Sequence, residues 1–245
     1  MILNAASEGL NYYATMISVL ITGSNRGIGL EFARQYAQSS WRVFATCRRP
    51  AEAGELHELA ERHPSLSVHR LDVTVPDDIR AIAWELEDTP LDVLINNAGI
   101  YLEKGTPELG GLRYEDWLRT FEINTLGGVR MTEALLDNVA RSDERLIVTI
   151  SSHMGSIADI QSPGSYYYRS SKAALNAAMQ GLAVALRPRG IGVLLLHPGW
   201  VRTRMGGSGG ISPEESVRGM RKVIDEFTLE DSGRFIQYDG TELPW

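Results

Sequence analysis

Short apolar segments alternate with longer segments of helical periodicity along nearly the whole chain. Some of the apolar segments contain no polar residue, which is typical of strands covered on both faces. This alternation predicts an α/β fold: a single domain with a doubly wound parallel sheet of about seven strands and helices on both faces. The predicted strands are residues 18–22, 42–46, 66–70, 91–95, 145–150, 192–196 and 234–237, and the predicted helices are 31–36, 52–62, 76–87, 114–140 and 168–187.

Three glycines separate the first predicted strand from its helix, in the order Gly-x-x-x-Gly-x-Gly. Glycines let the backbone approach a pyrophosphate, whose charge then meets the helix N-terminus. The spacing differs from the Gly-x-Gly-x-x-Gly fingerprint, and a tight strand-to-helix turn is the alternative explanation. The position on the first strand–helix unit favours nucleotide binding by Gly23, Ser24, Asn25, Arg26, Gly27, Ile28 and Gly29.

The end of the second predicted strand bears on which dinucleotide binds. NAD sites carry an acidic residue there for the ribose 2′-hydroxyl, whereas an arginine accommodates a 2′-phosphate. This chain has Cys47, Arg48 and Arg49 in that region, with Arg26 in the glycine turn. Guanidinium groups suit phosphate because they donate two parallel hydrogen bonds and stay charged. Solvation of a loop is the alternative for Arg48 and Arg49, but with the glycine turn upstream we expect NADP(H).

Tyr168 and Lys172 are four residues apart on a predicted helix, which puts both side chains on one face. An ammonium beside a phenol favours the phenolate, so we expect the Tyr168 pKa to fall from about 10 toward working pH. Such a tyrosine is fit to exchange a proton with a carbonyl or alcohol. Because Tyr–Lys pairs are common on amphipathic helices, the spacing alone also fits a pair without function.

Composition narrows the functional classes. The 245 residues are 43% hydrophobic and 22% charged with a net charge of −7, which argues against a nucleic-acid or anionic-membrane surface. A single cysteine fits a reducing compartment, and we expect the cytoplasm. The five histidines lack metal-ligand spacing, so no metal site is expected. Residues 1–15 are expected to be a poorly ordered extension, with Met16 as the natural start of a domain over residues 16–245.

Several motifs follow one another in the order of a known family. The chain resembles the short-chain dehydrogenase/reductase family, and within it the C-factor/sniffer-type carbonyl reductases. The resemblance covers nearly the whole chain after Met16 and implies a Rossmann-type fold. It rests on the glycine turn 22–29, Leu71-Asp-Val73, Asn96-Asn-Ala-Gly99, Asn124, Ser151-Ser152, Tyr168-x-x-x-Lys172, His197-Pro-Gly-Trp-Val201 and Tyr238-Asp-Gly-Thr241.

The resemblance implies NADPH-dependent reduction of a small carbonyl compound. Tyr168 would protonate the carbonyl oxygen, and Lys172 would lower the Tyr168 pKa and hold the nicotinamide ribose. Ser152 would stabilise the developing charge, and Asn124 would support a water linked to Lys172. The remaining cofactor residues implied are Asp72 and Val73 at the adenine, Asn97, Ala98 and Gly99 at the adenosine ribose, and Pro198, Gly199, Val201 and Thr203 over the nicotinamide. By analogy the protein is expected to be a homodimer or homotetramer.

Five points need separate comment at this stage. Ser151 is the alternative to Ser152, although alternate residues at a strand end face opposite sides and only one can face the nicotinamide. Of three consecutive tyrosines, only Tyr168 has a lysine four residues on. A substrate loop is expected over residues 203–228. Within it, residues 206–210 are either a lid that orders on binding or a solvent-exposed stretch without a function. The segment between Ser152 and Tyr168 is longer than usual for the family. A binding protein that senses NADP(H) without turnover is the alternative function.

Overall fold

Seven parallel strands form one sheet in the order β3-β2-β1-β4-β5-β6-β7. The computed structural model describes residues 16–103 and 109–245, so the extension expected over residues 1–15 lies outside the described residues. The predicted fold class is confirmed, and the seven predicted strands are present with ends shifted by two residues at most. They are β1 (Ser18–Ile21), β2 (Arg42–Cys47), β3 (Leu66–Arg70), β4 (Val93–Asn96), β5 (Leu146–Ile150), β6 (Gly192–His197) and β7 (Phe235–Gln237).

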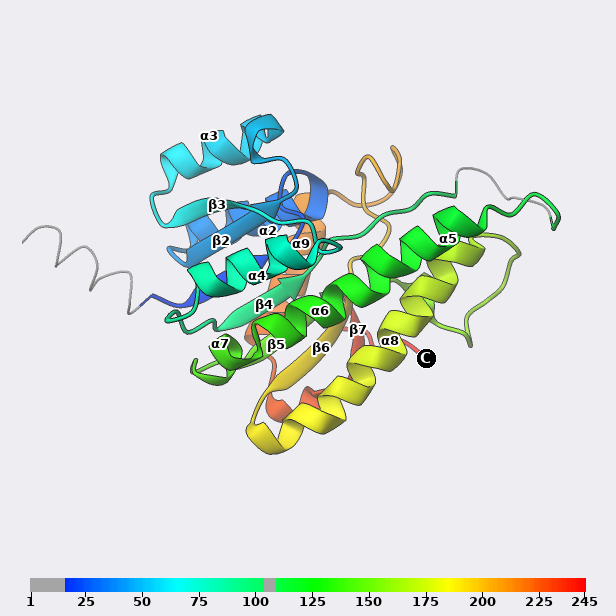
Figure 1. The fold of residues 1–245 in the computed structure, drawn as a ribbon. Helices are drawn as coiled ribbons and strands as arrows, with labels where there is room; N and C mark the ends of the chain where they lie inside the picture. Colours follow the sequence, from blue (N-terminus) through cyan, green and yellow to red (C-terminus); the bar gives the residue numbers. More distant parts are fainter. Residues whose placement is uncertain (1–15, 104–108) are drawn as a thin grey trace, which may run out of the picture.

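Helices cover both faces of this sheet, as Figure 1 shows. Neighbouring residues of β1 belong to different cores: Val19 and Ile21 pack on one face, and Leu20 packs on the other. Both cores are apolar, which explains why the strands lack the polar alternation of a one-sided sheet. One face carries α2 (Gly27–Gln38), α3 (Gly54–Arg62) and α9 (Pro213–Asp225), and the other carries α4 (Pro76–Glu85), α5 (Tyr114–Phe121), α6 (Gly127–Ala134), α7 (Leu136–Ala140) and α8 (Tyr166–Leu186).

The single helix predicted over residues 114–140 is interrupted. A π-helical turn, η2 (Glu122–Leu126), separates α5 from α6, and Asn124 lies in it. Gly127 follows the turn, and a Cβ there would lie 2.7 Å from Cγ2 of Val73. The helix therefore lies close against the chain that leaves β3. π turns inside α-helices are frequent at functional sites, so the interruption directs attention to Asn124.

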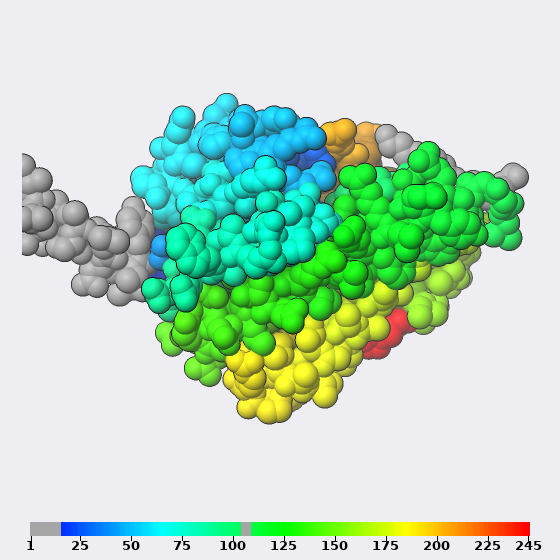
Figure 2. Space-filling model, in the orientation of Figure 1, coloured from blue at the N-terminus to red at the C-terminus, as the bar shows by residue number. Residues whose placement is uncertain are grey.

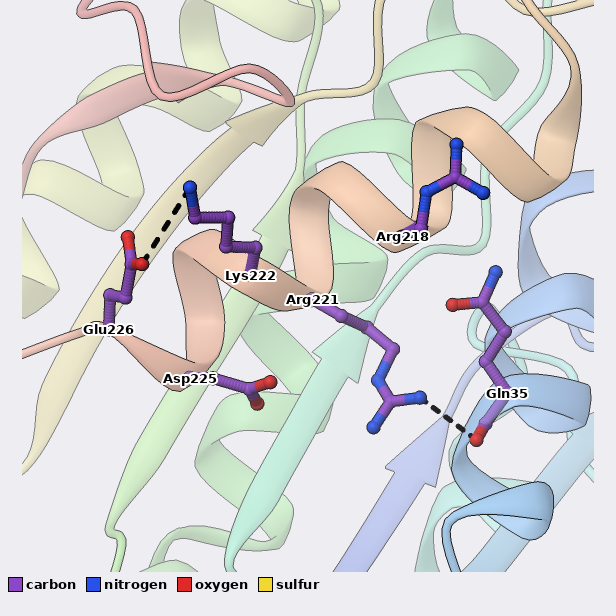
Figure 3. A pocket seen from close by; sticks show the side chains of 6 residues that line it. All are labelled: Gln35, Arg218, Arg221, Lys222, Asp225 and Glu226. Carbon is purple, nitrogen blue, oxygen red and sulfur yellow. Dashed lines mark hydrogen bonds and ion pairs between the residues drawn. The ribbon is translucent and has the colours of Figure 1, made fainter.

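The loop expected over residues 203–228 is in large part a helix, α9. Ser212 caps it by accepting a hydrogen bond from the Glu215 amide (3.1 Å), and Pro213 occupies its first turn. Its apolar face packs in the same core as α2, and Arg221 donates to the Gln35 carbonyl oxygen (2.9 Å). The shallow hollow of Figure 3 lies between these two helices and is lined by Gln35, Arg218, Arg221, Lys222, Asp225 and Glu226.

Helices α5 and α6 continue one another through the π turn and lie beside the long helix α8 (Figure 1), and these segments cover one face of the molecule in green and yellow (Figure 2). Helix α8 ends at Leu186 and continues into a short 3₁₀ turn, η4 (Arg187–Arg189), close to the predicted stop at Pro188. None of the helices in the described part of the chain is long and apolar enough to cross a membrane.

Candidate active site

The predicted site residues gather at the carboxyl edge of the sheet, where the strand order reverses between β1 and β4. Open α/β sheets bind ligands at such a crevice. A side chain at Gly23 would lie 3.1 Å from Ala98 Cα, and one at Gly27 would lie 3.4 Å from Thr203 Cγ2. A side chain at Gly99 would lie 3.8 Å from Lys172 Nζ. Four segments far apart in the sequence thus meet around one space.

The glycine turn adopts a conformation that needs glycine. Gly23 and Gly27 have φ angles of +71° and +57°, and a methyl group at Gly29 would overlap the Gly23 carbonyl oxygen. Ser24 is fully buried, and its hydroxyl donates to the Ile21 carbonyl oxygen (2.8 Å), so it closes the turn. Helix α2 then begins with no capping side chain and no acidic residue in its first turn. Its first amides are free of side-chain acceptors, which suits a phosphate.

Thr22 was not among the predicted site residues, yet its hydroxyl joins the ends of β1 and β4. It accepts hydrogen bonds from the amides of Asn97 and Ala98, both at 2.9 Å. The Asn97 side chain donates to the carbonyl oxygens of Thr22 (2.8 Å) and Gly23 (3.2 Å). Asn97 therefore holds the glycine turn in place with its side chain. Its neighbours Ala98 and Gly99 face the crevice.

Two arginines follow β2, and they differ in their partners. Arg49 forms an ion pair with Glu52 (3.1 Å), and both side chains are exposed. Arg48 is exposed and has no ion pair with any residue of the described chain. At the end of β3, the Asp72 carboxylate accepts hydrogen bonds from the amide (3.0 Å) and hydroxyl (2.7 Å) of Thr74. Of the two arginines, Arg48 is the one without an acidic partner in the described chain.

Tyr168 lies on the first turn of α8 beside Ser152 and Lys172. The Ser152 hydroxyl lies close enough to act on the pKa of Tyr168, the Tyr101 ring stands perpendicular to the Tyr168 ring with centres 5.1 Å apart, and Lys172 Nζ lies 5.8 Å from the Tyr168 ring centre. Tyr167 points elsewhere: its hydroxyl accepts from the Arg113 amide (2.5 Å). The structure therefore brings together the three side chains expected to act, and it separates them from the neighbouring tyrosine.

The two serines that follow β5 also point to different partners. The Ser151 hydroxyl is buried and donates to Asn176 Oδ1 (2.5 Å). Ser152 accepts a hydrogen bond from the Met154 amide (3.2 Å), which starts the short 3₁₀ turn η3 (His153–Gly155). Since only Ser152 reaches Tyr168, this geometry favours the second serine, as alternation at the strand end predicts.

Burial dominates the protonation of both Tyr168 and Lys172. It raises the pKa of Tyr168 to about 12, against a smaller lowering by the hydrogen bond with Ser152. Burial also lowers the pKa of Lys172 to about 8, and its ammonium donates to the Ile150 carbonyl oxygen (2.8 Å). The expectation that Lys172 brings the Tyr168 pKa down toward working pH is therefore wrong for the protein without ligand. Loss of water on burial is the main cause of the raised Tyr168 pKa.

Asn124 uses its amide to hold the chain that follows β4. Its Oδ1 accepts from the Ile100 amide (2.8 Å), while its Nδ2 donates to the Ile100 carbonyl oxygen (2.9 Å) and to the Ser171 hydroxyl (3.1 Å). A side chain at Gly99 would lie 3.4 Å from Asn124 Oδ1 as well as close to Lys172. Asn124 thus lies near the ammonium, although its own bonds go to the backbone.

The segment after β6 forms one wall of the crevice. Pro198 is fixed by its carbonyl oxygen, which accepts from the Ser216 hydroxyl (2.6 Å) of α9. Residues 202–210 form a closed loop because Val201 and Ile211 pair as a β-bridge and the Trp200 indole donates to the Gly206 carbonyl oxygen (2.8 Å). A side chain at Gly209 would overlap the indole ring, so the loop packs directly on Trp200.

Within the described residues, no group of three or more His, Cys, Asp or Glu side chains is arranged to hold a metal ion. His153 and His197 do lie close together, with ring centres 4.9 Å apart. Burial and the neighbouring His153 lower the pKa of His197 to about 3, so His197 is neutral at pH 7. His197 therefore adds no positive charge beside the residues that follow Ser152.

Comparisons with known proteins agree with this geometry. The sequence model of the short chain dehydrogenase family matches residues 18–210. The C-signal protein of Myxococcus xanthus is 47% identical over 169 residues, which are 68% of this chain and all of that protein. The structure is similar to NADPH-bound carbonyl reductase from chicken fatty liver (TM-score 0.87, 36% identity, 94% and 99% of the two chains). It is also similar to the carbonyl reductase Sniffer of D. melanogaster (0.86, 34%, 94% and 100%).

We expect Gly29→Ala to distort the glycine turn, because its methyl group would overlap the Gly23 carbonyl oxygen. Overpacking of this kind costs about 1–3 kcal/mol of stability. Chemical unfolding and titration with NADPH should both detect the change. Gly54→Ala is the matched control, since no atom lies within 4 Å of the added methyl. Equal stability and equal NADPH binding for Gly29→Ala and Gly54→Ala would contradict this description of the turn.

Lys172→Met should change how stability depends on pH. The folded-state pKa of Lys172, about 8, lies below its ordinary value of 10.5, so protonation opposes folding at low pH. That penalty is fully present below pH 8 and is relieved as pH rises to 10.5. The unfolding free energy of the wild type should therefore gain about 3 kcal/mol on the variant across this range. Urea unfolding at several pH values measures the difference, and a pH-independent difference would contradict it.

Proposed function

Because the chain belongs to the short-chain dehydrogenase family, we propose that it is an NADPH-dependent oxidoreductase that reduces an aldehyde, ketone or quinone to the alcohol. The observation that carries this proposal is the convergence of Ser152, Tyr168 and Lys172 at one point of the crevice. A hydroxyl pair beside a buried ammonium can bind a carbonyl oxygen and deliver a proton to it. Similarity to NADPH-bound carbonyl reductase supports the same reaction.

The residues of the crevice fit a dinucleotide. The uncapped first turn of α2 and the glycine turn that approaches it suit the pyrophosphate, with Gly23, Gly27 and Gly29 leaving room for it. Ala98 and Gly99 would border the adenosine ribose. Asp72 and Val73 would border the adenine, and Pro198, Gly199, Val201 and Thr203 would cover the nicotinamide. NADPH, when bound, supplies the hydride to the carbonyl carbon.

Side chains of the protein then protonate the substrate oxygen and stabilise the negative charge that develops on it. Tyr168, with a pKa of about 12, is neutral at pH 7 and holds the proton that this oxygen needs. The Ser152 hydroxyl donates a hydrogen bond to the same oxygen, which stabilises the charge as it develops. The phenolate left on Tyr168 is stabilised by the Lys172 ammonium, whose Nζ lies 5.8 Å from the ring centre. We assign to Asn124 the role of supporting a water linked to Lys172, through which Tyr168 would regain its proton.

We propose that Arg48 selects NADP(H) by binding the 2′-phosphate. Its guanidinium is exposed next to the end of β2, while Arg49 is paired with Glu52. Arg26 is exposed at the start of α2 and adds a second positive charge near the same ligand. The residues directly after β2 are Arg48 and Arg49, so no acidic residue stands there to accept a ribose 2′-hydroxyl, as NAD sites require. A cytoplasmic reductase working with NADPH is the resulting assignment.

Exposed apolar side chains on two neighbouring helices support a homodimer or homotetramer. Leu118 on α5 is 72% exposed, and Val184 on α8 is 69% exposed. Both helices lie on the face shown in Figure 2. Helices with such residues gain free energy when a second copy covers them.

A second candidate function is NADP(H) binding without turnover. The observation that favours it is the similarity to C-signal, a protein named for a signal and not for a reaction. This chain covers the whole length of C-signal at 47% identity. A protein that only binds the dinucleotide has no use for a proton donor at Tyr168. The two candidates therefore differ in what the Tyr168 hydroxyl does.

Tyr168→Phe separates the two functions. It removes the proton and keeps the ring, so NADPH oxidation with an aldehyde, a ketone or a quinone should fall by about 100-fold or more. Tyr167→Phe is the matched control, because its hydroxyl contacts the Arg113 amide away from the site. Absorbance at the nicotinamide band measures turnover, and fluorescence measures binding. If the wild type and Tyr168→Phe consumed NADPH equally slowly while both bound it, binding without turnover would be the function.

Arg48→Asp tests the choice of cofactor. Replacing a guanidinium at a phosphate by a carboxylate should weaken NADPH binding roughly 10- to 100-fold and change NADH binding little. Arg49→Asp makes the same charge change at the neighbouring arginine, which is paired with Glu52, and should leave the preference for NADPH unchanged. Dissociation constants for both cofactors give the comparison. Equal losses for NADPH and NADH in Arg48→Asp would remove Arg48 from the 2′-phosphate site.

A further inference from the structure

Helix α8 begins without a cap from its own sequence. Its N-cap residue, Ser165, has a left-handed conformation (φ 54°), and its side chain makes no capping hydrogen bond to the helix. The first amides of a helix need acceptors from elsewhere. This first turn carries Tyr168, so whatever holds the turn also sets where the phenol lies.

The acceptor comes from the chain that follows β4. Glu103 is 3% exposed, and its Oε2 accepts a hydrogen bond from the Tyr168 amide at 3.0 Å, across 65 residues of sequence. A carboxylate at a helix N-terminus is also stabilised by the helix dipole. Its other oxygen, Oε1, is buried and has no hydrogen-bond partner among the residues that the structure describes. Leaving a buried carboxylate oxygen unpartnered opposes folding, so stability alone is a poor explanation for a glutamate here.

Tyr101, two residues earlier, holds the same turn. Its hydroxyl is hydrogen-bonded to the Ser165 hydroxyl (2.8 Å), and its ring packs edge-on against Tyr168, 5.1 Å between centres at 85°. The segment of Tyr101 and Glu103 therefore contacts the N-cap, the amide and the ring of the reacting residue. Just before it come Ala98 and Gly99 at the proposed ribose site and Ile100, which Asn124 holds through two hydrogen bonds.

We propose that Glu103 is a positioning residue for the reaction: its carboxylate fixes the first turn of α8 and thereby the Tyr168 phenol against Ser152. The proposal rests on the proposed function for its catalytic consequence and on geometry for its structural part. The decisive property is reach to the Tyr168 amide. Gln keeps the length and an acceptor oxygen but loses the charge. Asp keeps the charge but is one methylene too short.

Glu103→Asp should lower kcat with a saturating quinone by about tenfold or more, because small displacements of a reacting group are costly. The NADPH dissociation constant should stay within about twofold, since the residue lies away from the glycine turn. Glu103→Gln should retain kcat within about threefold. Hydrogen–deuterium exchange should be faster at the amides of residues 166–168 in Glu103→Asp and unchanged in Glu103→Gln. Glu115→Asp, an exposed carboxylate in the first turn of α5, is the control.

Exchange is measured on the protein without substrate, so it decides the positioning role even if no carbonyl is turned over. Wild-type protection of residues 166–168 in Glu103→Asp would overturn the proposal. So would a loss of kcat in Glu103→Gln as large as in Glu103→Asp, since charge would then matter and reach would not. Absence of NADPH oxidation in the wild type, with exchange as expected, would overturn the proposed function and leave the positioning of Tyr168 standing.

Discussion

A buried ammonium fixes the relation between helix α8 and the end of strand β5, and the site depends on that contact. Lys172 donates to the Ile150 carbonyl oxygen at the last residue of the strand. Gly155 packs so closely on α8 that a Cβ there would lie 2.9 Å from the Lys172 carbonyl carbon. Ser152 leaves the strand between these two contacts, and Tyr168 lies one helical turn before Lys172. The separation of the Ser152 and Tyr168 hydroxyls therefore depends on these two contacts between α8 and the end of β5.

Burial acts on the two ionisable groups in opposite directions, and both effects serve the proposed reduction. Tyr168 is kept protonated because the phenolate loses water, whereas Lys172 holds its proton less firmly, with a pKa of about 8. A proton donor must keep its proton until negative charge arrives on the substrate. The ammonium costs stability in the free protein, where its hydrogen bond to the Ile150 carbonyl oxygen brings no opposite charge, and it gains a negatively charged partner when a phenolate forms beside it. A stability cost of this kind, from the burial of ionisable groups, is typical of functional sites.

The sequence was sufficient for features that repeat along the chain and insufficient for those that depend on distant partners. Apolar runs located all seven strands because both faces of the sheet are buried. Helix α9 was missed, although Ser212, Pro213 and the acidic residues after them form a helix start. The pKa of Tyr168 was predicted in the wrong direction because desolvation depends on the surrounding fold. Glu103 had no local signal, since its partner is 65 residues away.

Chemistry and specificity are separated in this fold. The groups proposed to act lie on a strand end and a helix, which hold side chains more firmly than loops do. The walls of the crevice are loops, and each is held by its own contacts. Residues 202–210 pack on Trp200, and the loop before α8 is held by the C-terminal segment, because the Trp245 carbonyl oxygen accepts from the Ala158 amide (2.9 Å). Figure 2 shows this segment emerging beside that loop. Changes in either loop can therefore alter which substrate fits the proposed reduction without moving Tyr168.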